Sequence, residues 1–162
     1  MLFRSTAAQT TANLSQARTP VGISEGSTKG YFAGGLTSST GRVITADKLT
    51  FSNDTTAAQT TANLSLGRDS LAGCSGEGSK GYFAGGISGT TLGGVYVTTT
   101  DKLTYSNDNT SAQTTADLSQ PRQNLGGISE GSTKGYFVGG ILAGSNNYSS
   151  VADKLTYSND TT

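Results

Sequence analysis

The chemistry open to this chain is limited first by which reactive side chains it contains. The sequence has no His and a single Cys, Cys74. Ser-His-Asp and Cys-His catalytic arrangements are therefore absent, as are zinc or copper sites built on imidazole or on several thiolates. Cys74 takes the place that Ile23 and Ile128 hold in equivalent stretches. We therefore expect it to be a small buried hydrophobic residue.

Paired carboxylates remain a possible catalytic group, because a glycosidase needs only two. The candidate aspartates recur at two fixed positions, Asp47, Asp101 and Asp153 at one and Asp54, Asp108 and Asp160 at the other. A single catalytic pair would break this repetition, whereas turn residues that bond their own backbone would follow it. We predict a protein that is not an enzyme and has no metal or cofactor, with a carboxylate-dependent glycosidase as a distant alternative.

Repetition extends to the whole chain. The segment GSTKGYFAGG (26–35) returns as EGSKGYFAGG (77–86) and as GSTKGYFVGG (131–140). The blocks DKLT(F/Y)SND and AQTTA(N/D)LS also occur three times each, in the same order. A period of about 50 residues lies in the range of propeller blades. We predict a single repeat domain, 1–162, with repeats 7–56, 57–110 and 111–162.

Composition favours an ordered all-β protein, because Thr and Tyr suit strands while Gly and Asn suit tight turns. Eleven basic residues balance eleven acidic ones, which gives no electrostatic reason to expect nucleic acid or a membrane surface as a partner. No apolar stretch approaches the roughly 18 residues of a membrane span. The N-terminal MLFRSTAAQ lacks the apolar core of a classical signal peptide. We expect a cytoplasmic or virion location.

Each repeat contains four candidate strands. The first is AQTTANLS, whose Thr, Asn and Ser content argues against a helix. The second follows an arginine and runs through VGIS, LAGCS or LGGIS. The third is KGYFAGG or KGYFVGG, closed by paired glycines that permit backbone conformations other residues avoid. The fourth is DKLTFS or DKLTYS, whose alternation puts Leu49 and Phe51 on one face and Lys48 and Thr50 on the other.

One stretch varies among the repeats, between the third and fourth strands. It comprises Leu36–Ala46, Ile87–Thr100 and Ile141–Ala152. Because its length and content both change, we expect an exposed loop or hairpin tip. It carries aromatic and amide side chains of the kind that sugars often contact. One set of candidate ligand-binding residues is therefore Tyr96, Asn146, Asn147 and Tyr148.

The order of these features resembles the kelch repeat: an arginine, a small-residue strand, a Tyr-containing strand ending in paired Gly, and a strand ending in an aromatic residue. PRQNLGGISEGSTKGYFVGG (121–140) carries the resemblance most fully, and it extends over all three repeats. Kelch blades usually have a Trp on the outermost strand, whereas this chain has none and is rich in Ala and Thr near Ala57 and Ala58. The outer edge should therefore pack differently. The blocks DKLT(F/Y)SND, ANLS and GYFAGG also resemble kelch-like arrays in structural proteins of marine bacteriophages and cyanophages.

The resemblance implies a kelch-like β-propeller with three four-stranded blades per chain. In kelch proteins, the arginines that match Arg18, Arg68 and Arg122 lie at one mouth of the central channel, where some members bind partners. They form the second candidate ligand-binding set, for carboxylates, sulfates or acidic glycans held by bidentate contacts. Alternatively, each arginine ties neighbouring blades through a backbone carbonyl or a repeat Asp. The copper oxidase activity known on a kelch scaffold would need histidine ligands, which this chain lacks.

Three blades cannot close a ring, because propellers typically have four to eight. The chain ends just after a fourth strand (153–158) and begins just before a first strand (8–15). We predict a six-bladed homodimer of two head-to-tail chains, each N-terminal strand completing the other chain's last blade. Half of a longer protein, another assembly, or a fibre or β-helix are the alternatives. The predicted function is a non-enzymatic structural or binding module, a virion or appendage component that engages a glycan or another protein; a stand-alone glycan-binding lectin is the alternative.

Overall fold

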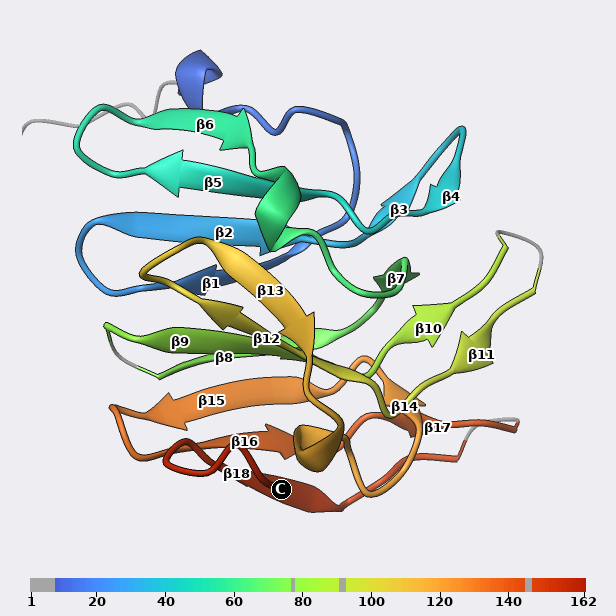
Figure 1. Cartoon of the computed structure of the whole chain (residues 1–162). Coiled ribbons are helices and arrows are strands. Elements are labelled where there is room, and N and C mark those ends of the chain that lie inside the picture. The colour runs from blue at the N-terminus through green and yellow to red at the C-terminus, as the bar shows by residue number, and fades with distance from the viewer. Residues whose placement is uncertain (1–7, 77, 91–92, 145–146) are drawn as a thin grey trace, which may run out of the picture.

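Three antiparallel sheets are stacked face to face in the order in which the chain forms them (Figure 1). Sheet 1 contains, in spatial order, β1 (Val21–Ser24), β2 (Lys29–Ala33), β5 (Ala46–Thr50) and β6 (Thr55–Ala58). Sheet 2 contains β8 (Ala72–Gly76), β9 (Lys80–Ala84), β12 (Thr100–Thr104) and β13 (Asn109–Ala112). Sheet 3 contains β15 (Gly126–Glu130), β16 (Lys134–Val138) and β18 (Ala152–Thr156). This computed structural model describes residues 8–76, 78–90, 93–144 and 147–162.

The protein is all-β, as its composition predicted. The described residues contain no α-helix, and their helical structure is limited to three 3-10 turns, η1 (Thr10–Ala12), η2 (Thr60–Ala62) and η3 (Thr114–Ala116). Over these same parts of the chain, no helix has the length and apolar character needed to cross a membrane.

The second, third and fourth predicted strands are confirmed in every repeat, and they keep one register. Ile23 lies opposite Tyr31 in sheet 1, and Cys74 lies opposite Tyr82 in sheet 2. Sheet 3 repeats the pairing with Ile128. A one-residue slip would move every side chain to the other face, so the common register gives all three sheets the same facing residues.

The prediction that AQTTANLS forms a strand is wrong. The outermost strands β6 and β13 end at Ala58 and Ala112, and the chain then turns into η2 and η3. Side chains compete for the backbone here: Thr61 Oγ1 donates to the carbonyl of Asp108 at 2.7 Å and accepts from Gln59 Nε2 at 2.8 Å. Residues 8–15 likewise form η1 and irregular chain here, and the prediction that they complete the last sheet of another copy stays a prediction.

The variable stretches form short hairpins that project from the same side of the stack (Figure 1). In the first repeat β3 (Leu36–Thr37) pairs with β4 (Gly41–Arg42). In the second, β10 (Ile87–Ser88) pairs with β11 (Val95–Tyr96) and with β7 (Arg68–Asp69). In the third, β17 (Ile141–Leu142) pairs with β14 (Arg122–Gln123). Val95 is 70% exposed, which confirms that the second hairpin lies at the surface, whereas Ala46 and Thr100 at the ends of their stretches are buried in the sheets.

Paired glycines end the third strand and let the next repeat approach closely. Gly85 has φ +68°, and a Cβ there would lie 2.8 Å from the carbonyl oxygen of Arg122. The following glycine, Gly86, donates its backbone N–H to that carbonyl at 2.9 Å. A side chain at this turn would be strained and would separate the two repeats.

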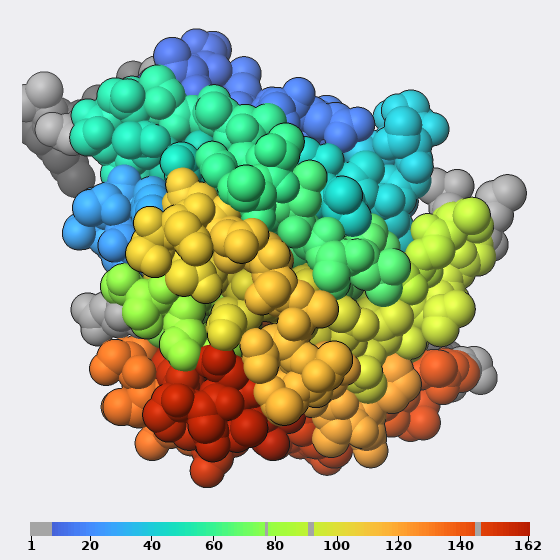
Figure 2. Space-filling view, viewed as in Figure 1, coloured from blue at the N-terminus to red at the C-terminus, as the bar shows by residue number. Residues whose placement is uncertain are grey.

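The hydrophobic core is divided into two layers, one on each side of sheet 2. The layer between sheets 1 and 2 includes Ile23, Tyr31, Phe83, Leu103 and Tyr105. The layer between sheets 2 and 3 includes Cys74, Tyr82, Phe137, Leu155 and Tyr157. Cys74 is thus a buried hydrophobic residue, as expected. The N-terminal and C-terminal repeats lie at opposite ends of the stack (Figure 2). Among the described residues, one face of sheet 1 and one face of sheet 3 have no other sheet packed against them.

Candidate functional site

The three predicted channel arginines are buried and paired with the first set of repeated aspartates. Arg68 Nη2 lies 3.0 Å from Asp101 Oδ2, and both side chains are fully buried. The equivalent pairs are Arg18 with Asp47 at 2.8 Å and Arg122 with Asp153 at 2.8 Å. None of the three guanidinium groups forms an open rim in this structure, so ligand binding by these arginines stays a prediction.

The backbone of two of these arginines links neighbouring repeats, while the side chains of all three bond within their own repeat. The side chain of Arg68 donates from Nη2 to the carbonyl of Phe83 at 2.8 Å, inside its own sheet. Its backbone carbonyl accepts the N–H of Gly35, in the preceding repeat, at 2.9 Å. Arg122 contacts Phe137 and Gly86 in the same way. Each of these two arginines therefore ties neighbouring repeats, and each pair removes one repeated carboxylate from the candidates for catalysis.

The second set of repeated aspartates forms clusters between the sheets. Asp108, in the turn after β12 of sheet 2, accepts from Lys29 Nζ at 2.8 Å and from Lys48 Nζ at 2.6 Å. The hydroxyl of Tyr31 donates to the same carboxylate. All three donors belong to sheet 1. Asp160 of sheet 3 receives the equivalent donors of sheet 2, Lys80, Lys102 and Tyr82.

These contacts decide the protonation state of the two aspartates. Burial acts to raise the pKa of Asp108, but the hydrogen bonds from Lys29, Lys48 and Tyr31 outweigh it and lower the pKa from 3.8 to about 2. The pKa of Asp160 is about 2 for the same reasons. In turn, burial and the adjacent carboxylate raise the pKa of Tyr31.

The backbone conformation at these aspartates repeats as well, because Asp108 and Asp160 have φ of 53° and 54°.

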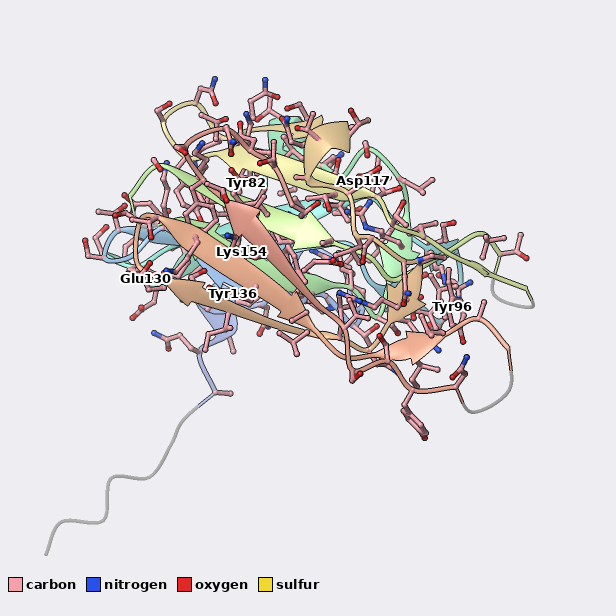
Figure 3. All side chains as sticks on the ribbon, turned by 90° about the horizontal axis from the view of Figure 1, so that it is seen from below. Tyr82, Tyr96, Asp117, Glu130, Tyr136 and Lys154 are labelled. Carbon is pink, nitrogen blue, oxygen red and sulfur yellow. The ribbon has the colours of Figure 1, made fainter. Side chains whose placement is uncertain are left out.

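The third copy of this cluster is split between the two ends of the stack. Asp54 has the same turn conformation, with φ 53°, but it is exposed, and Gln9 Nε2 donates to it at 3.1 Å. The matching donors are Lys134, Tyr136 and Lys154 of sheet 3. Figure 3 shows Tyr136 and Lys154 on sheet 3, whose outer face no other sheet of the described chain covers. Among the described residues, the ion pair of Lys134 is with Glu130, at 3.9 Å.

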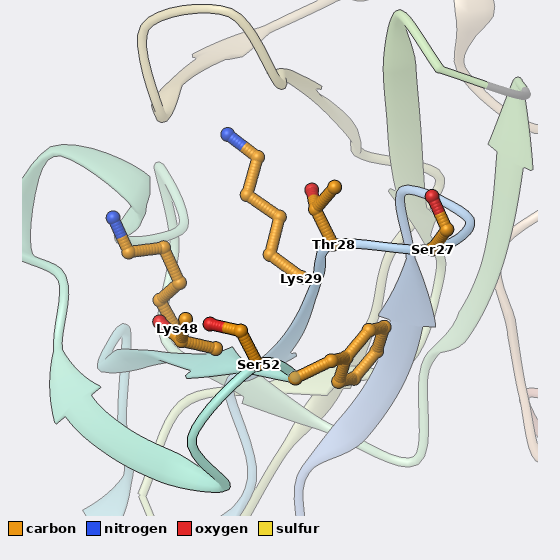
Figure 4. A pocket seen from close by; sticks show the side chains of 7 residues that line it. Ser27, Thr28, Lys29, Lys48 and Ser52 are labelled. Atoms are coloured by element: carbon orange, nitrogen blue, oxygen red, sulfur yellow. The ribbon is translucent and has the colours of Figure 1, made fainter.

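A row of hollows follows the same end of each sheet. The first, of about 530 Å³, is lined by Ser27, Thr28, Lys29, Lys48, Thr50, Phe51 and Ser52 (Figure 4). The second, of about 420 Å³, is lined by the equivalent residues of sheet 2, including Ser79, Lys80 and Lys102. A third, of about 490 Å³, is lined by Lys80, Thr133 and Tyr157 among others. Hydroxyl and ammonium groups line all three, joined by the ring of Phe51 in the first and of Tyr157 in the third.

The candidate ligand-binding residues of the hairpins differ in how exposed their side chains are. The side chain of Tyr148 is exposed, and residue 148 pairs with Ile141 through an isolated β-bridge. Tyr96 on β11 is half-buried, and its hydroxyl accepts from Gln123 Nε2 of the next repeat at 2.8 Å. Asn147 is exposed, whereas Asn146 lies outside the described residues. The structure thus links Tyr96 to the third repeat and leaves Tyr148 open to solvent.

Comparisons with known proteins do not assign this chain. No protein-family model matches the sequence, and no curated protein matches it either. Within the described parts of the chain, no group of three or more His, Cys, Asp or Glu residues is placed to hold a metal ion.

Proposed function

We propose that this protein is a non-enzymatic structural and binding module built as half of a kelch-like β-propeller. The observation that carries the proposal is the strand order of sheets 1 and 2. In each, four antiparallel strands lie side by side in the order in which the chain forms them, and the sheets stack face to face. That is the arrangement of propeller blades. The kelch resemblance of the sequence supports the same assignment, and two chains together would supply six blades.

We infer that the hairpins are the surface with which the module contacts its partner. They differ in length and sequence while the sheets beneath them repeat, and variation over a rigid frame is typical of binding loops. The burial of Arg18, Arg68 and Arg122 favours the hairpins over the predicted rim. A virion or appendage component that engages a receptor fits both the fold and the phage-like repeats.

A stand-alone glycan-binding lectin is the second candidate. The observation that favours it is the row of hollows, because repeated lectin sites commonly occupy equivalent positions and these hollows are lined by Ser, Thr and Lys. A glycan array with the purified protein tests both candidates.

The array should be repeated with two exposed-residue variants. Tyr148→Ala removes a hairpin ring that is 73% exposed, and Ser52→Ala changes the first hollow. The hairpin proposal expects Tyr148→Ala to weaken binding at least about tenfold, with Ser52→Ala unchanged. Loss of binding in Ser52→Ala alone would assign the site to the hollows and contradict the proposal. Electron microscopy of the same sample should show closed rings, and elongated particles would contradict the propeller.

A further inference from the structure

We propose that the uncovered face of sheet 3 binds the uncovered face of sheet 1 in a second copy of this chain, with Lys134, Tyr136 and Lys154 surrounding the partner copy's Asp54. This rests on the proposed function, whose propeller needs more blades than one chain supplies. It adds which side chains close the ring. The chain already forms two such interfaces within itself, between sheets 1 and 2 and between sheets 2 and 3.

The two internal interfaces use the same contacts. Between sheets 1 and 2, Tyr31 stacks on Tyr105 with ring centroids 5.7 Å apart and planes at 10°. Between sheets 2 and 3, Tyr82 stacks on Tyr157 at 5.4 Å and 5°. In each case a carboxylate of the later sheet lies beneath two lysines and the tyrosine of the earlier sheet. Sheet-to-sheet docking in this protein therefore follows a fixed pattern of residues.

Sheet 3 carries the donor half of this pattern, and within the described parts of the chain no other sheet packs against this donor half. Ile128 is 64% exposed, although the equivalent Ile23 and Cys74 are 8% and 4% exposed. Val138 is 42% exposed, although the equivalent Ala33 and Ala84 are fully buried. An apolar row flanked by lysines is therefore open at this end of the stack.

Sheet 1 carries the acceptor half. Phe32, Leu49 and Phe51 are half-buried, whereas their equivalents in sheets 2 and 3 are buried. Those equivalents are Phe83, Leu103 and Tyr105 in sheet 2 and Phe137, Leu155 and Tyr157 in sheet 3. Asp54 lies in the turn that follows β5. The two uncovered faces are therefore complementary. The apolar row of one would pack on the apolar row of the other, and the lysines of sheet 3 would pair with Asp54 of sheet 1.

A second copy of the chain is the occupant that these faces specify. The donor and acceptor halves belong to one chain and follow its own repeat, so a copy placed as a fourth repeat reproduces the internal interface. The contact is head to tail, and such contacts form rings when the rotation closes. Two chains give six sheets, within the four to eight of closed propellers, whereas three chains would give nine.

One residue distinguishes the interface between copies from the two internal ones. Tyr105 Oη of sheet 2 donates to the carbonyl of Ser24 in sheet 1 at 3.2 Å, whereas Tyr157 Oη shares a hydrogen bond of 2.8 Å with Ser129 Oγ within sheet 3. Phe51 holds the equivalent position and has no hydroxyl. The interface between copies therefore lacks the hydrogen bond by which Tyr105 links sheet 2 to sheet 1. Phe51→Tyr should restore it and tighten the association.

Charge-reversal variants and native mass spectrometry test the interface. The unmodified protein is expected at about twice the monomer mass of 16.4 kDa. Asp54→Lys, and separately Lys134→Asp with Lys154→Asp, should each raise the dissociation constant at least about 30-fold for each interface. Because a closed pair contains the contact twice, the combined loss should be about a thousandfold. Phe51→Tyr should lower the dissociation constant about fivefold or more.

The decisive experiment mixes the Asp54→Lys variant with the Lys134→Asp, Lys154→Asp variant. A mixed pair has one original contact and one with its charges exchanged, so it should form a heterodimer although neither variant pairs with itself. Ser38→Lys, on the exposed tip of the β3–β4 hairpin, is the matched control and should leave the dimer intact. Circular dichroism of the dilute variants should show unchanged sheet content, because the substituted side chains lie outside both core layers.

The outcomes separate this inference from the proposed function. A dimer that survives both charge reversals would overturn the interface while leaving the propeller proposal standing. A wild-type chain that stays monomeric at micromolar concentration would overturn the interface and the six-bladed ring together. Open chains of many copies, seen as a ladder of masses, would overturn ring closure by two copies.

Discussion

Phe83 is the residue at which the packing of neighbouring sheets can be measured most directly. Its side chain is fully buried in the core layer between sheets 1 and 2. Replacing a buried Phe with Ala removes its transfer free energy and leaves a cavity that the surroundings fill only in part. We expect Phe83→Ala to lower the free energy of unfolding by about 3–5 kcal/mol, a large share of the roughly 5–15 kcal/mol of a typical domain.

The repeat supplies an internal replicate for this measurement. Phe137 occupies the equivalent place against sheet 2 and is also fully buried, so Phe137→Ala should lose a similar amount. Phe83→Leu, which nearly conserves volume and hydrophobicity, should cost less than about 1.5 kcal/mol. Urea unfolding followed by far-ultraviolet circular dichroism gives the midpoint and the slope, and an unchanged slope would show that stability alone has changed.

The reasoning would be refuted by a stable variant that no longer binds. If Phe83→Ala unfolds within about 1 kcal/mol of the wild type and loses a glycan or protein ligand, the repeated rings form a binding platform. The role of Phe83 would then be ligand binding and not core packing. If Phe137→Ala alone is costly, the two core layers are not equivalent, and the argument from repetition fails.

Two further predictions concern charged groups. Arg68→Met leaves Asp101 buried without its partner and should cost about 3–5 kcal/mol, whereas adding Asp101→Leu should recover most of it; thermal melting of single and double variants measures this, and equal melting temperatures would contradict it. Because the folded-state pKa of Asp108 and Asp160 is about 2 against 3.8 ordinarily, their stabilisation is present above pH 4 and should be lost as the pH falls from about 4 to about 2. Asp160→Asn should make that loss shallower in an acid titration, and an identical profile would count against the cluster.

The local structure of the repeat could be predicted well from the sequence. Alternation in DKLTFS placed Lys48 and Leu49 on opposite faces, and the structure agrees, since Lys48 reaches Asp108 of the next sheet while Leu49 faces the other way. The glycine pair predicted the end of the third strand because few other residues adopt its backbone angles. These signals depend on a few neighbouring residues, so they predict local structure without knowledge of the tertiary contacts.

Predictions failed where the deciding partner lies far along the chain. AQTTANLS has the composition of a strand, but Thr61 bonds to a carbonyl 47 residues away and the backbone turns instead. The lysine clusters could not be predicted either, because Lys29 pairs with Asp108 of the following repeat, 79 residues further along the chain. The sequence shows that the lysines and aspartates recur, and this recurrence was the available signal. It does not show that they pair across repeats instead of within one.

Equivalent residues also differ in exposure for a reason that no single repeat contains. Ile23 and Ile128 are the same residue type at the same register position, yet one is 8% and the other 64% exposed. What buries Ile23 is the following sheet, so each repeat is completed by its neighbour. Repeat arrays that end in solvent usually carry a polar outer face on the last unit. Here the last sheet instead keeps the isoleucine and adds Val138 in place of Ala33, so its outer face has the composition of an interior. Such a composition is expected of a face that another sheet covers. A second copy of the chain would supply that sheet.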